Sequence, residues 1–343
     1  MSQSDRHGLV IVGAGQGGLS AAIHARLLGW EVTVIEASEQ AGGKAASIAI
    51  DGYRLDPGPS IIILPDIYRD VFRRAGRDPE DYVKFDRLDP VTRVFFEGLH
   101  EPIDLPASAD DAVEALSKHA RSDGPALQRL LSTLDRVAPA IERTVLARPI
   151  EKWWHLADPR LARAAMAFDP QLTYKELVDN MFSSPLLRSF FYGFPSYSGQ
   201  TYDSKAAGAL LIPYFMFRHG VWFPEGGVGA IPRAFVRLAR ELGVKFLFKT
   251  RAVGLRTEGT RVAAVETDDG EVPASAVVSN LDRVTVGAMF GRPLPKRTSF
   301  SYLTFHWGVR DTLEGLAHHT LLVPEGFEKG FEDLYRRRQV PVG

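Results

Sequence analysis

The chain opens with two short apolar runs separated by a glycine-rich turn and a helical pattern. The apolar runs are Leu9–Val12 and Val32–Ile35, and the helical pattern covers Leu19–Leu28 and ends at Gly29. Continuous rather than alternating apolar runs are typical of parallel strands that are buried on both faces. The pattern therefore predicts a strand, helix, strand unit at the centre of a covered parallel sheet.

The same alternation of helix and strand returns late in the chain. Helical patterns fill Ile67–Ala75, Ala109–Ala147 and Ala230–Leu242, and Val244–Phe248 reads as a strand after Gly243. Three further apolar runs follow, separated by the turn residues Gly259 and Asp268-Asp269-Gly270: Val253–Glu258, Arg261–Thr267 and Val272–Ser279. Their spacing predicts a short antiparallel ribbon.

The middle of the chain has a different character, because Trp153–Phe223 is unusually rich in aromatic residues. A length of 343 residues suits about two domains. We therefore expect an α/β fold in which a nucleotide-binding domain, residues 1–84 plus 221–290, is interrupted by a second domain, residues 85–220 plus 291–343.

Composition excludes several functional classes. The chain has 41 Lys and Arg against 42 Asp and Glu, so no overall field draws it to nucleic acid. It contains no cysteine, which rules out disulfides, thiolate catalysis and cysteine metal sites, and suits a reducing cytoplasm.

Membrane insertion is not expected either. The polar residues Met1–Gly8 lead directly into the first apolar run and leave no room for an export signal. No apolar run reaches the roughly 18–20 residues that span a bilayer. Any membrane contact is expected to be peripheral.

The glycine turn Gly13-Ala14-Gly15-Gln16-Gly17-Gly18 lies between the first predicted strand and its helix. Its glycines allow a tight turn, close approach of backbone to a pyrophosphate, and close packing of helix on strand. The N-terminus of the helix then faces the phosphates with free N–H groups. The turn predicts a dinucleotide site that includes Gly13, Ala14, Gly15, Gly17 and Gly18.

Glu36, followed by Ala37, ends the second predicted strand, close to the expected spacing of about 20 residues from the turn. Its carboxylate can accept hydrogen bonds from ribose hydroxyls and would repel a 2′-phosphate, which leaves NAD and FAD open. Gly42-Gly43-Lys44 could place bare backbone and a cation along the same pyrophosphate, but the spacing alone does not choose between them.

Five segments together resemble the bacterial and fungal carotenoid desaturases of the phytoene desaturase type. These are Gly13–Gly18 with Glu36, Gly42-Gly43-Lys44, Asp56-Pro57-Gly58-Pro59-Ser60, Gly220-Val221-Trp222-Phe223-Pro224-Glu225-Gly226-Gly227, and Ala317-His318-His319-Thr320. The resemblance follows the order of the whole chain, and its most specific part is the run from Gly220 to Gly227.

The resemblance implies a non-covalent FAD in a Rossmann-like domain. Gly13, Gly15, Gly18 and Glu36 match the family's glycine and acid positions, and Lys44 with Gly43 matches the basic residue after the paired glycines. By the same resemblance, Val253 lies against the adenine through its backbone, and Pro59 and Ser60 lie near the isoalloxazine. The implied reaction removes hydrogens from an acyclic carotenoid such as phytoene, with the flavin reoxidised by a quinone or oxygen.

A polyene substrate would require an apolar site, and it would be drawn from a bilayer. The aromatic tract could line such a tunnel, although each aromatic residue alone reads as core, and some could instead form a patch at the lipid interface. The resemblance thus implies a cytoplasmic protein at the inner face of the cell membrane.

Asp158 is the candidate general base, since an acidic residue occurs here in similar desaturases and a proton must leave during desaturation. The alternative is a helix N-cap, because Asp158-Pro159 is an ordinary helix start. His318-His319 invites a metal, but adjacent residues of a strand point to opposite faces, and we expect no metal site.

Desaturases of this type end with a glycine-rich strand and helix that close over the flavin, and this chain stops before them, so we expect it to be C-terminally incomplete. Other functions on the same fold stay open: a carotene isomerase, a retinol-saturase-like reductase, an amine oxidase, or an inactive remnant that binds FAD or lipid.

Overall fold

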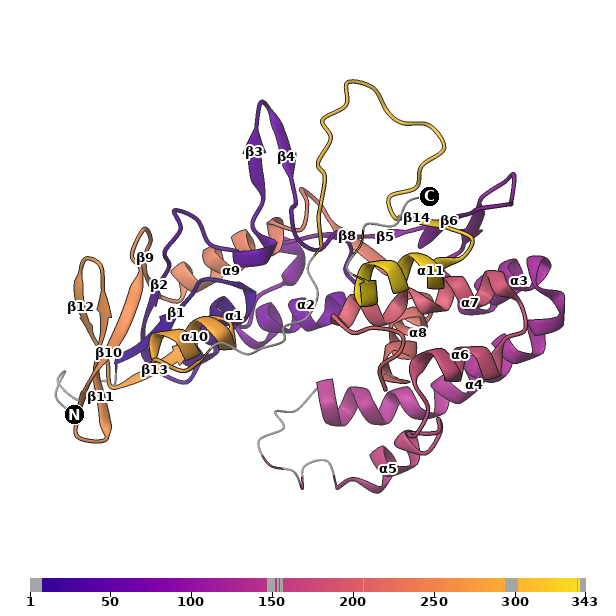
Figure 1. Ribbon diagram of the computed structural model, residues 1–343. Helices are drawn as coiled ribbons and strands as arrows, with labels where there is room; N and C mark the ends of the chain where they lie inside the picture. Colours follow the sequence, from indigo (N-terminus) through magenta and orange to yellow (C-terminus); the bar gives the residue numbers. More distant parts are fainter. Residues whose placement is uncertain are drawn as a thin grey trace. The chain divides into compact units, whose positions relative to one another are not determined.

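The chain forms two units (Figure 1). The computed structural model describes residues 8–146, 152, 154, 157–205, 207–293, 302–337 and 339. Unit 1 contains the described residues of 8–86, 222–293 and 302–310, and unit 2 contains those of 87–221 and 311–339. Unit 2 is therefore inserted into the chain of unit 1. Residues 302–310 lie in unit 1, whereas the sequence assigned them to the second domain.

Unit 1 is built on a four-stranded parallel sheet in the order β13-β1-β2-β9 (Figure 1). Its strands are β1 (Gly8–Val12), β2 (Glu31–Ile35), β9 (Lys245–Leu247) and β13 (Ala276–Ser279). Val10 pairs with Thr33 on one side and Val277 on the other, which makes β1 one of the two inner strands. The predicted strand, helix, strand unit is confirmed.

Both faces of this sheet are covered, as the continuous apolar runs predicted. Leu9 and Ile11 point into a core shared with α1 (Gln16–Leu27) and α9 (Ala230–Glu241). Val10 and Val12 point the other way, toward Val265 on the antiparallel ribbon. Side chains that alternate across the strand thus fill two separate cores, one helical and one formed by β-structure.

The ribbon is formed by three strands: β10 (Ala252–Glu258), β11 (Arg261–Thr267) and β12 (Gly270–Pro273). The sequence placed the whole run Val272–Ser279 in this ribbon, and this is wrong for its second half. The chain leaves the ribbon after β12, and Ala276–Ser279 joins the parallel sheet as β13 beside β1. In a run of only four residues, the alternating pattern of a ribbon strand cannot be told from the continuous pattern of a buried parallel strand. Only the hydrogen-bond pairing in the structure distinguishes β12 from β13.

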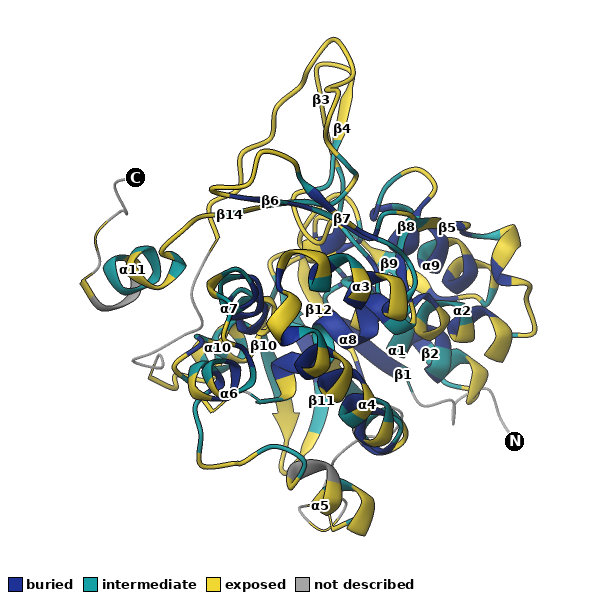
Figure 2. Cartoon of the chain, turned by 90° about the vertical axis from the view of Figure 1, so that its right-hand side faces the viewer, coloured by how far each residue is buried: buried dark blue, intermediate teal, exposed yellow. Residues whose placement is uncertain are grey.

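The remaining elements of unit 1 surround this framework. They are β3 (Ile48–Ile50) and β4 (Tyr53–Leu55), which form an exposed hairpin (Figure 2), α2 (Pro65–Arg74) and α10 (Arg283–Met289). The strands β5 (Phe85–Leu88) and β8 (Val221–Pro224) stand where the chain passes between the units.

Unit 2 combines a small sheet with helices. Its strands are β6 (Thr92–Phe96), β7 (Ile103–Leu105) and β14 (Thr320–Val323), and its helices are α3 (Ala109–His119), α4 (Gly124–Ile141), α5 (Pro159–Ala165), α6 (Tyr174–Met181), α7 (Pro185–Tyr192), α8 (Leu211–Arg218) and α11 (Phe327–Glu332). The helical pattern expected over Ala109–Ala147 is interrupted after His119, where a short 3₁₀ turn separates α3 from α4. Among the described residues, no helix is both long and apolar enough to cross a membrane.

The aromatic tract supplies about half of the buried apolar residues of unit 2, and β6, β7, α3 and α4 supply most of the others. Phe190, Phe191 and Tyr192 of α7 are buried, as are Tyr214 to Phe217 of α8. Phe191 stacks on Phe182 at 4.9 Å between ring centroids, and Phe190 meets Phe194 edge to face at 5.2 Å. These aromatic rings are therefore packed core residues. Trp153 lies outside the described residues.

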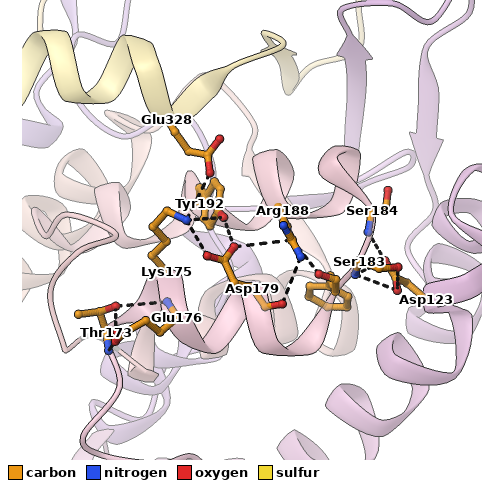
Figure 3. Close-up of polar contacts among 11 residues, drawn as sticks. Asp123, Thr173, Lys175, Glu176, Asp179, Ser183, Ser184, Arg188, Tyr192 and Glu328 are labelled. Carbon is orange, nitrogen blue, oxygen red and sulfur yellow. Dashed lines mark hydrogen bonds and ion pairs between the residues drawn. The ribbon is translucent and has the colours of Figure 1, made fainter.

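A polar network ties α6, α7 and α11 together (Figure 3). Lys175 Nζ lies 2.6 Å from Asp179 Oδ2 and 3.4 Å from Glu328 Oε1. The Tyr192 hydroxyl donates to Asp179, and burial followed by this hydrogen bond raises the pKa of Tyr192 far above its ordinary value. The network thus connects α11, through Glu328, to α6 and α7.

Asp123 anchors the start of α7 from a distant part of the chain (Figure 3). Its buried carboxylate accepts hydrogen bonds from the backbone amides of Ser183 and Ser184, at 2.9 and 2.6 Å, and from the Ser183 hydroxyl at 2.7 Å. Burial by itself would raise the pKa of Asp123, but these hydrogen bonds outweigh it and hold the pKa below its usual value. The carboxylate satisfies N–H groups that the helix cannot satisfy itself.

We expect Asp123→Ala to lower the free energy of unfolding by about 2–3 kcal/mol, because it leaves buried amide donors without partners. The exposed Glu101→Ala in the same unit is the control, with a change within about 0.5 kcal/mol. A depressed carboxyl pKa contributes stability above its unfolded value, so the difference between wild type and Asp123→Ala should narrow below about pH 4. Urea unfolding monitored by circular dichroism at pH 7 and pH 3 tests this, and equal losses for both variants would contradict it.

Candidate functional site

The glycine turn lies at the carboxyl edge of the parallel sheet, where ligands bind in folds of this class. The chain leaves β1 at Gly13, whose φ of +97° favours glycine and whose N–H donates to the Ile35 carbonyl at 2.8 Å. The helix α1 begins at Gln16 and has no acidic residue in its first turn. Its free N–H groups therefore face this edge and attract an anion.

Gly18 permits the helix to pack directly on the turn. A Cβ at Gly18 would lie 2.1 Å from the Gly13 carbonyl oxygen, which no real side chain tolerates. Leu19 N donates to the Gly15 carbonyl at 2.9 Å and continues the helix from the turn. The third glycine of the pattern thus has the packing role that the spacing predicted.

Glu36 stands at the end of β2 and holds two backbone segments together. Its Oε2 accepts from the Ala14 amide at 2.8 Å, and its Oε1 accepts from the Ser38 amide at 2.8 Å. Each carboxylate oxygen can accept a second hydrogen bond, so ribose hydroxyls can still bind there. The acid therefore both orients the glycine turn and keeps lone pairs for a ligand.

The paired glycines lie against the turn, as a shared site requires. Gly42 N donates to the Ala14 carbonyl at 2.8 Å, and Gly42 and Gly15 form an isolated parallel β-bridge. A Cβ at Gly43 would lie 3.3 Å from the Gly15 Cα. Lys44 follows in a short 3₁₀ turn with its side chain exposed.

The segment Asp56–Ser60 reaches the same region from β4. A Cβ at Gly58 would lie 1.8 Å from the Lys44 carbonyl oxygen, so the two backbones touch. Asp56 accepts from the Val228 amide at 2.7 Å and from the Ser47 hydroxyl at 2.7 Å. Asp56 thereby links two of the resembling segments, a role the sequence did not assign.

Asn280 is the residue of the site that the sequence reasoning missed. It follows β13 and donates its backbone N–H to the Val12 carbonyl at 2.8 Å. Its Nδ2 lies 2.7 Å from a Cβ built on Gly15, and its Oδ1 lies 2.6 Å from one built on Gly17. A polar residue just after a parallel strand was a usable signal, but Ala276–Ser279 had been assigned to the ribbon.

The site also contains an amide donor without a partner. Gln16 Nε2 is buried, and it is the one buried side-chain N or O atom without a hydrogen-bond partner in the described part of the chain. An unpaired donor within the glycine turn fits a ligand that has hydrogen-bond acceptor oxygens. The glycine positions and this donor together are suited to binding an anion.

Three other predicted residues are less closely tied to the turn. Pro59 and Ser60 continue from Gly58 with exposed side chains. Val253 is 51% exposed on β10, three residues after Thr250, whose amide donates to the Glu36 carbonyl at 3.0 Å. Their contacts with a flavin, like that of Ala37 beside Glu36, stay predictions.

Asp158 has the geometry of a helix cap. Its Oδ1 accepts from the Arg160 amide at 2.7 Å, and its carbonyl accepts from the Ala162 amide at 3.0 Å, at the start of α5. These are the contacts of an N-cap residue. A catalytic role for Asp158 stays a prediction.

Both ring nitrogens of His319 have side-chain partners in unit 2. Nδ1 lies 2.8 Å from the Thr92 hydroxyl, which also donates to the Val91 carbonyl at 2.8 Å. Nε2 lies 3.3 Å from the Tyr197 hydroxyl. Burial lowers the pKa of His319, so the ring is neutral and its two nitrogens are engaged by side chains. No group of three or more potential metal ligands occurs among the described residues.

Comparison with known proteins points to flavoenzymes. A family model of flavin-containing amine oxidoreductases matches residues 17–308. The chain is 32% identical to a phytoene dehydrogenase of Streptomyces griseus, over 96% of this chain and 65% of that protein. It is 30% identical to a 4,4'-diapolycopene oxygenase of a Methylomonas species, over 99% of this chain and 70% of that protein.

A solved oxidoreductase of Methanosarcina mazei shares the fold, with a TM-score of 0.56 and 20% sequence identity over 82% of this chain. The chain spans 60% of that structure and 65–70% of the two relatives.

The residues of unit 1 fit the FAD of these flavoenzymes. Side chains at positions 15, 17 and 18 would collide with Asn280 or with the Gly13 carbonyl, so glycines there keep the backbone bare for contact with a pyrophosphate, and Glu36 follows the end of β2, where a ribose would bind. Asn280 lies on the opposite side of β1, next to β13. The cofactor of this site is FAD, as the resemblance implied.

We expect Gly15→Ala to abolish FAD binding, because its methyl group would stand on the cradle and meet Asn280 Nδ2 at 2.7 Å. Gly8→Ala in β1 is the matched control, since the nearest atom to its Cβ is 3.9 Å away. Flavin absorbance of the purified proteins, with circular dichroism as the check on folding, measures the effect. A folded Gly15→Ala protein with full flavin content would contradict the assignment.

His319 makes stability depend on pH. Because its folded pKa is lowered, the unfolded state binds more protons below about pH 6.5, and stability falls as the pH drops from there. In the His319→Gln variant, the free energy of unfolding should fall less between pH 6.5 and pH 5 than in wild type. The exposed His119→Gln variant should show the same fall as wild type. Urea unfolding at several pH values measures both slopes, and a decline unchanged in His319→Gln would refute the account.

Proposed function

Because the chain belongs to the flavin-containing amine oxidoreductase family, we propose that it desaturates an acyclic carotenoid, such as phytoene or a later acyclic carotene, with FAD as the oxidant. The observation that carries the proposal is the cradle formed by Gly15, Glu36 and Gly43 in a chain that is similar over 96% of its length to a phytoene dehydrogenase. The run from Gly220 to Gly227 adds to this support, because the next residue, Val228, donates its amide to Asp56 at 2.7 Å.

The bound flavin would supply a hydride acceptor, and desaturation also releases a proton. The residues of this chain hold the cofactor: the glycine turn and the α1 N-terminus receive the phosphates, and Glu36 receives the adenosine ribose. Asp158 is the proposed proton acceptor. Its N-cap bond uses one oxygen, which leaves the second carboxylate oxygen able to take a proton.

A carotene has almost no hydrogen-bonding groups and lives in lipid, so its enzyme must receive it at a membrane surface. We propose peripheral attachment to the inner face of the cell membrane, with a quinone or oxygen as the final electron acceptor. Exposed apolar side chains support such an attachment: Ile48, Ile50 and Tyr53 on the β3–β4 hairpin, and Leu303, Phe305 and Trp307 near it in unit 1.

One relative suggests a second chemistry on the same scaffold. The Methylomonas protein is named an oxygenase, so introduction of oxygen into a carotene end group is the alternative reaction. Isomerisation is a third possibility that leaves the mass unchanged. The mass of the product separates them, since desaturation removes hydrogen in pairs and oxygenation adds oxygen.

Cells that accumulate phytoene and express the chain should form coloured carotenes of lower mass, detected by chromatography with mass spectrometry. The Gly15→Ala variant should leave phytoene unchanged, because it lacks the oxidant.

Phytoene that persists beside a fully flavin-loaded protein would contradict the phytoene assignment. Feeding later acyclic carotenes to the same protein then tests the wider proposal. Products with unchanged mass or added oxygen would replace desaturation by one of the two alternatives.

A further inference from the structure

A cavity of about 430 Å³ lies between α4 and α5 in unit 2, away from the glycine turn in the sequence and lined by strongly basic residues. Four of its described lining residues are arginines, namely Arg136, Arg143, Arg160 and Arg163. The others are Thr133, Val137, Ala140 and Ala167. None of the described lining residues is acidic.

Helical spacing explains why the arginines converge. Arg136 and Arg143 are seven residues apart, on one face of α4 and the π-helical turn that follows it. Arg160 and Arg163 are three residues apart on α5, which packs against α4. Ala140 and Ala167 are small, so the two faces meet with space between them and with guanidinium groups around it.

No carboxylate in the described part of the chain forms an ion pair with these four arginines. Elsewhere arginines pair with carboxylates at short distance, as Arg93 with Asp104 at 2.6 Å and Arg218 with Asp135 at 2.6 Å. Among the described residues, Arg143, Arg160 and Arg163 form no ion pair. Three described acids lie within two residues of these arginines, and each is engaged elsewhere: Asp135 pairs with Arg218, Glu142 lies 3.1 Å from His219, and Asp158 caps α5.

Four like charges around one cavity repel each other unless an anion lies among them. Guanidinium groups bind phosphate oxygens through paired N–H donors, and a site of several arginines is suited to a phosphate monoester or diester. A cavity of this volume holds a phosphate with its organic substituent.

We propose that the cavity formed by α4 and α5 binds the phosphate of an anionic lipid headgroup and docks this chain on the membrane. A lipid, rather than a free phosphate, is favoured as the ligand because exposed apolar side chains lie next to the lining residues in sequence. Met166, next to Ala167, is 81% exposed, and Leu146, just after Arg143, is 47% exposed. Trp154 is 52% exposed with Lys152 over its ring at 5.0 Å, an amphipathic pair typical of the headgroup region.

This proposal rests on the peripheral attachment given above and goes beyond it, because it assigns the lipid chemistry and the residues. It does not involve the FAD site or the desaturation chemistry. Loss of lipid binding can therefore be separated from loss of cofactor or activity.

The test is sedimentation of the full chain with vesicles of phosphatidylcholine alone and of phosphatidylcholine with phosphatidylglycerol. Wild type should bind the anionic vesicles more tightly, and added salt should weaken the binding. Arg143→Gln with Arg163→Gln should lower the affinity for anionic vesicles about 30-fold, which corresponds to two basic residues near a charged surface. Flavin absorbance of this double variant should equal that of wild type.

The control is Lys118→Gln with Arg121→Gln, which removes the same charge from exposed positions before the start of α4. Equal losses in the two double variants would attribute the binding to net charge and overturn the proposal. Binding to anionic vesicles that survives Arg143→Gln with Arg163→Gln would also overturn it. If inorganic phosphate at low millimolar concentration displaces the wild-type protein from vesicles and raises its Tm, but not that of the double variant, the cavity is a free-anion site and the lipid assignment fails.

Discussion

The contact between the helix α1 and the turn after β1 is the constraint on which the cofactor site depends. A Cβ at Gly18 would stand 2.1 Å from the Gly13 carbonyl, so the helix reaches its place only with glycine there. That placement aims the free amides of α1 at the carboxyl edge of the sheet. Glu36 then fixes the Ala14 amide, and Gly42 fixes the Ala14 carbonyl, from two sides. The site is thus formed by backbone contacts together with one charged side chain, the carboxylate of Glu36.

Local patterns were enough to predict this part of the molecule. The apolar runs of β1 and β2, the glycine spacing and the acid at the end of β2 all lie within a few tens of residues and require one another. Asn280 could not be found in the same way, because its role depends on β13 joining β1 from the far end of the chain. The break between α3 and α4 was also missed. The short 3₁₀ turn between them ends at Asp123, whose partner Ser183 lies 60 residues later, a contact that no local pattern contains.

Unit 2 contains two contrasting groups of charged side chains: carboxylates that are hydrogen-bonded within the protein, and arginines that line a cavity. Asp123 and Asp179 are fully engaged by donors, and they hold helices together. The four exposed arginines of α4, the turn after it and α5 line one cavity with no acidic residue among its described lining, an arrangement suited to binding an anion. No sequence pattern revealed this, because the four residues come from two segments separated by residues 144–159. Their convergence is a property of how α5 packs on α4.

The account as a whole depends on unit 1 holding FAD. The most direct measurement is the absorbance spectrum of the purified chain after incubation with FAD and removal of the excess, with the released flavin quantified against protein. The account predicts the absorption bands of a bound oxidised flavin at about one FAD per chain. A folded protein that stays colourless after this treatment would contradict it.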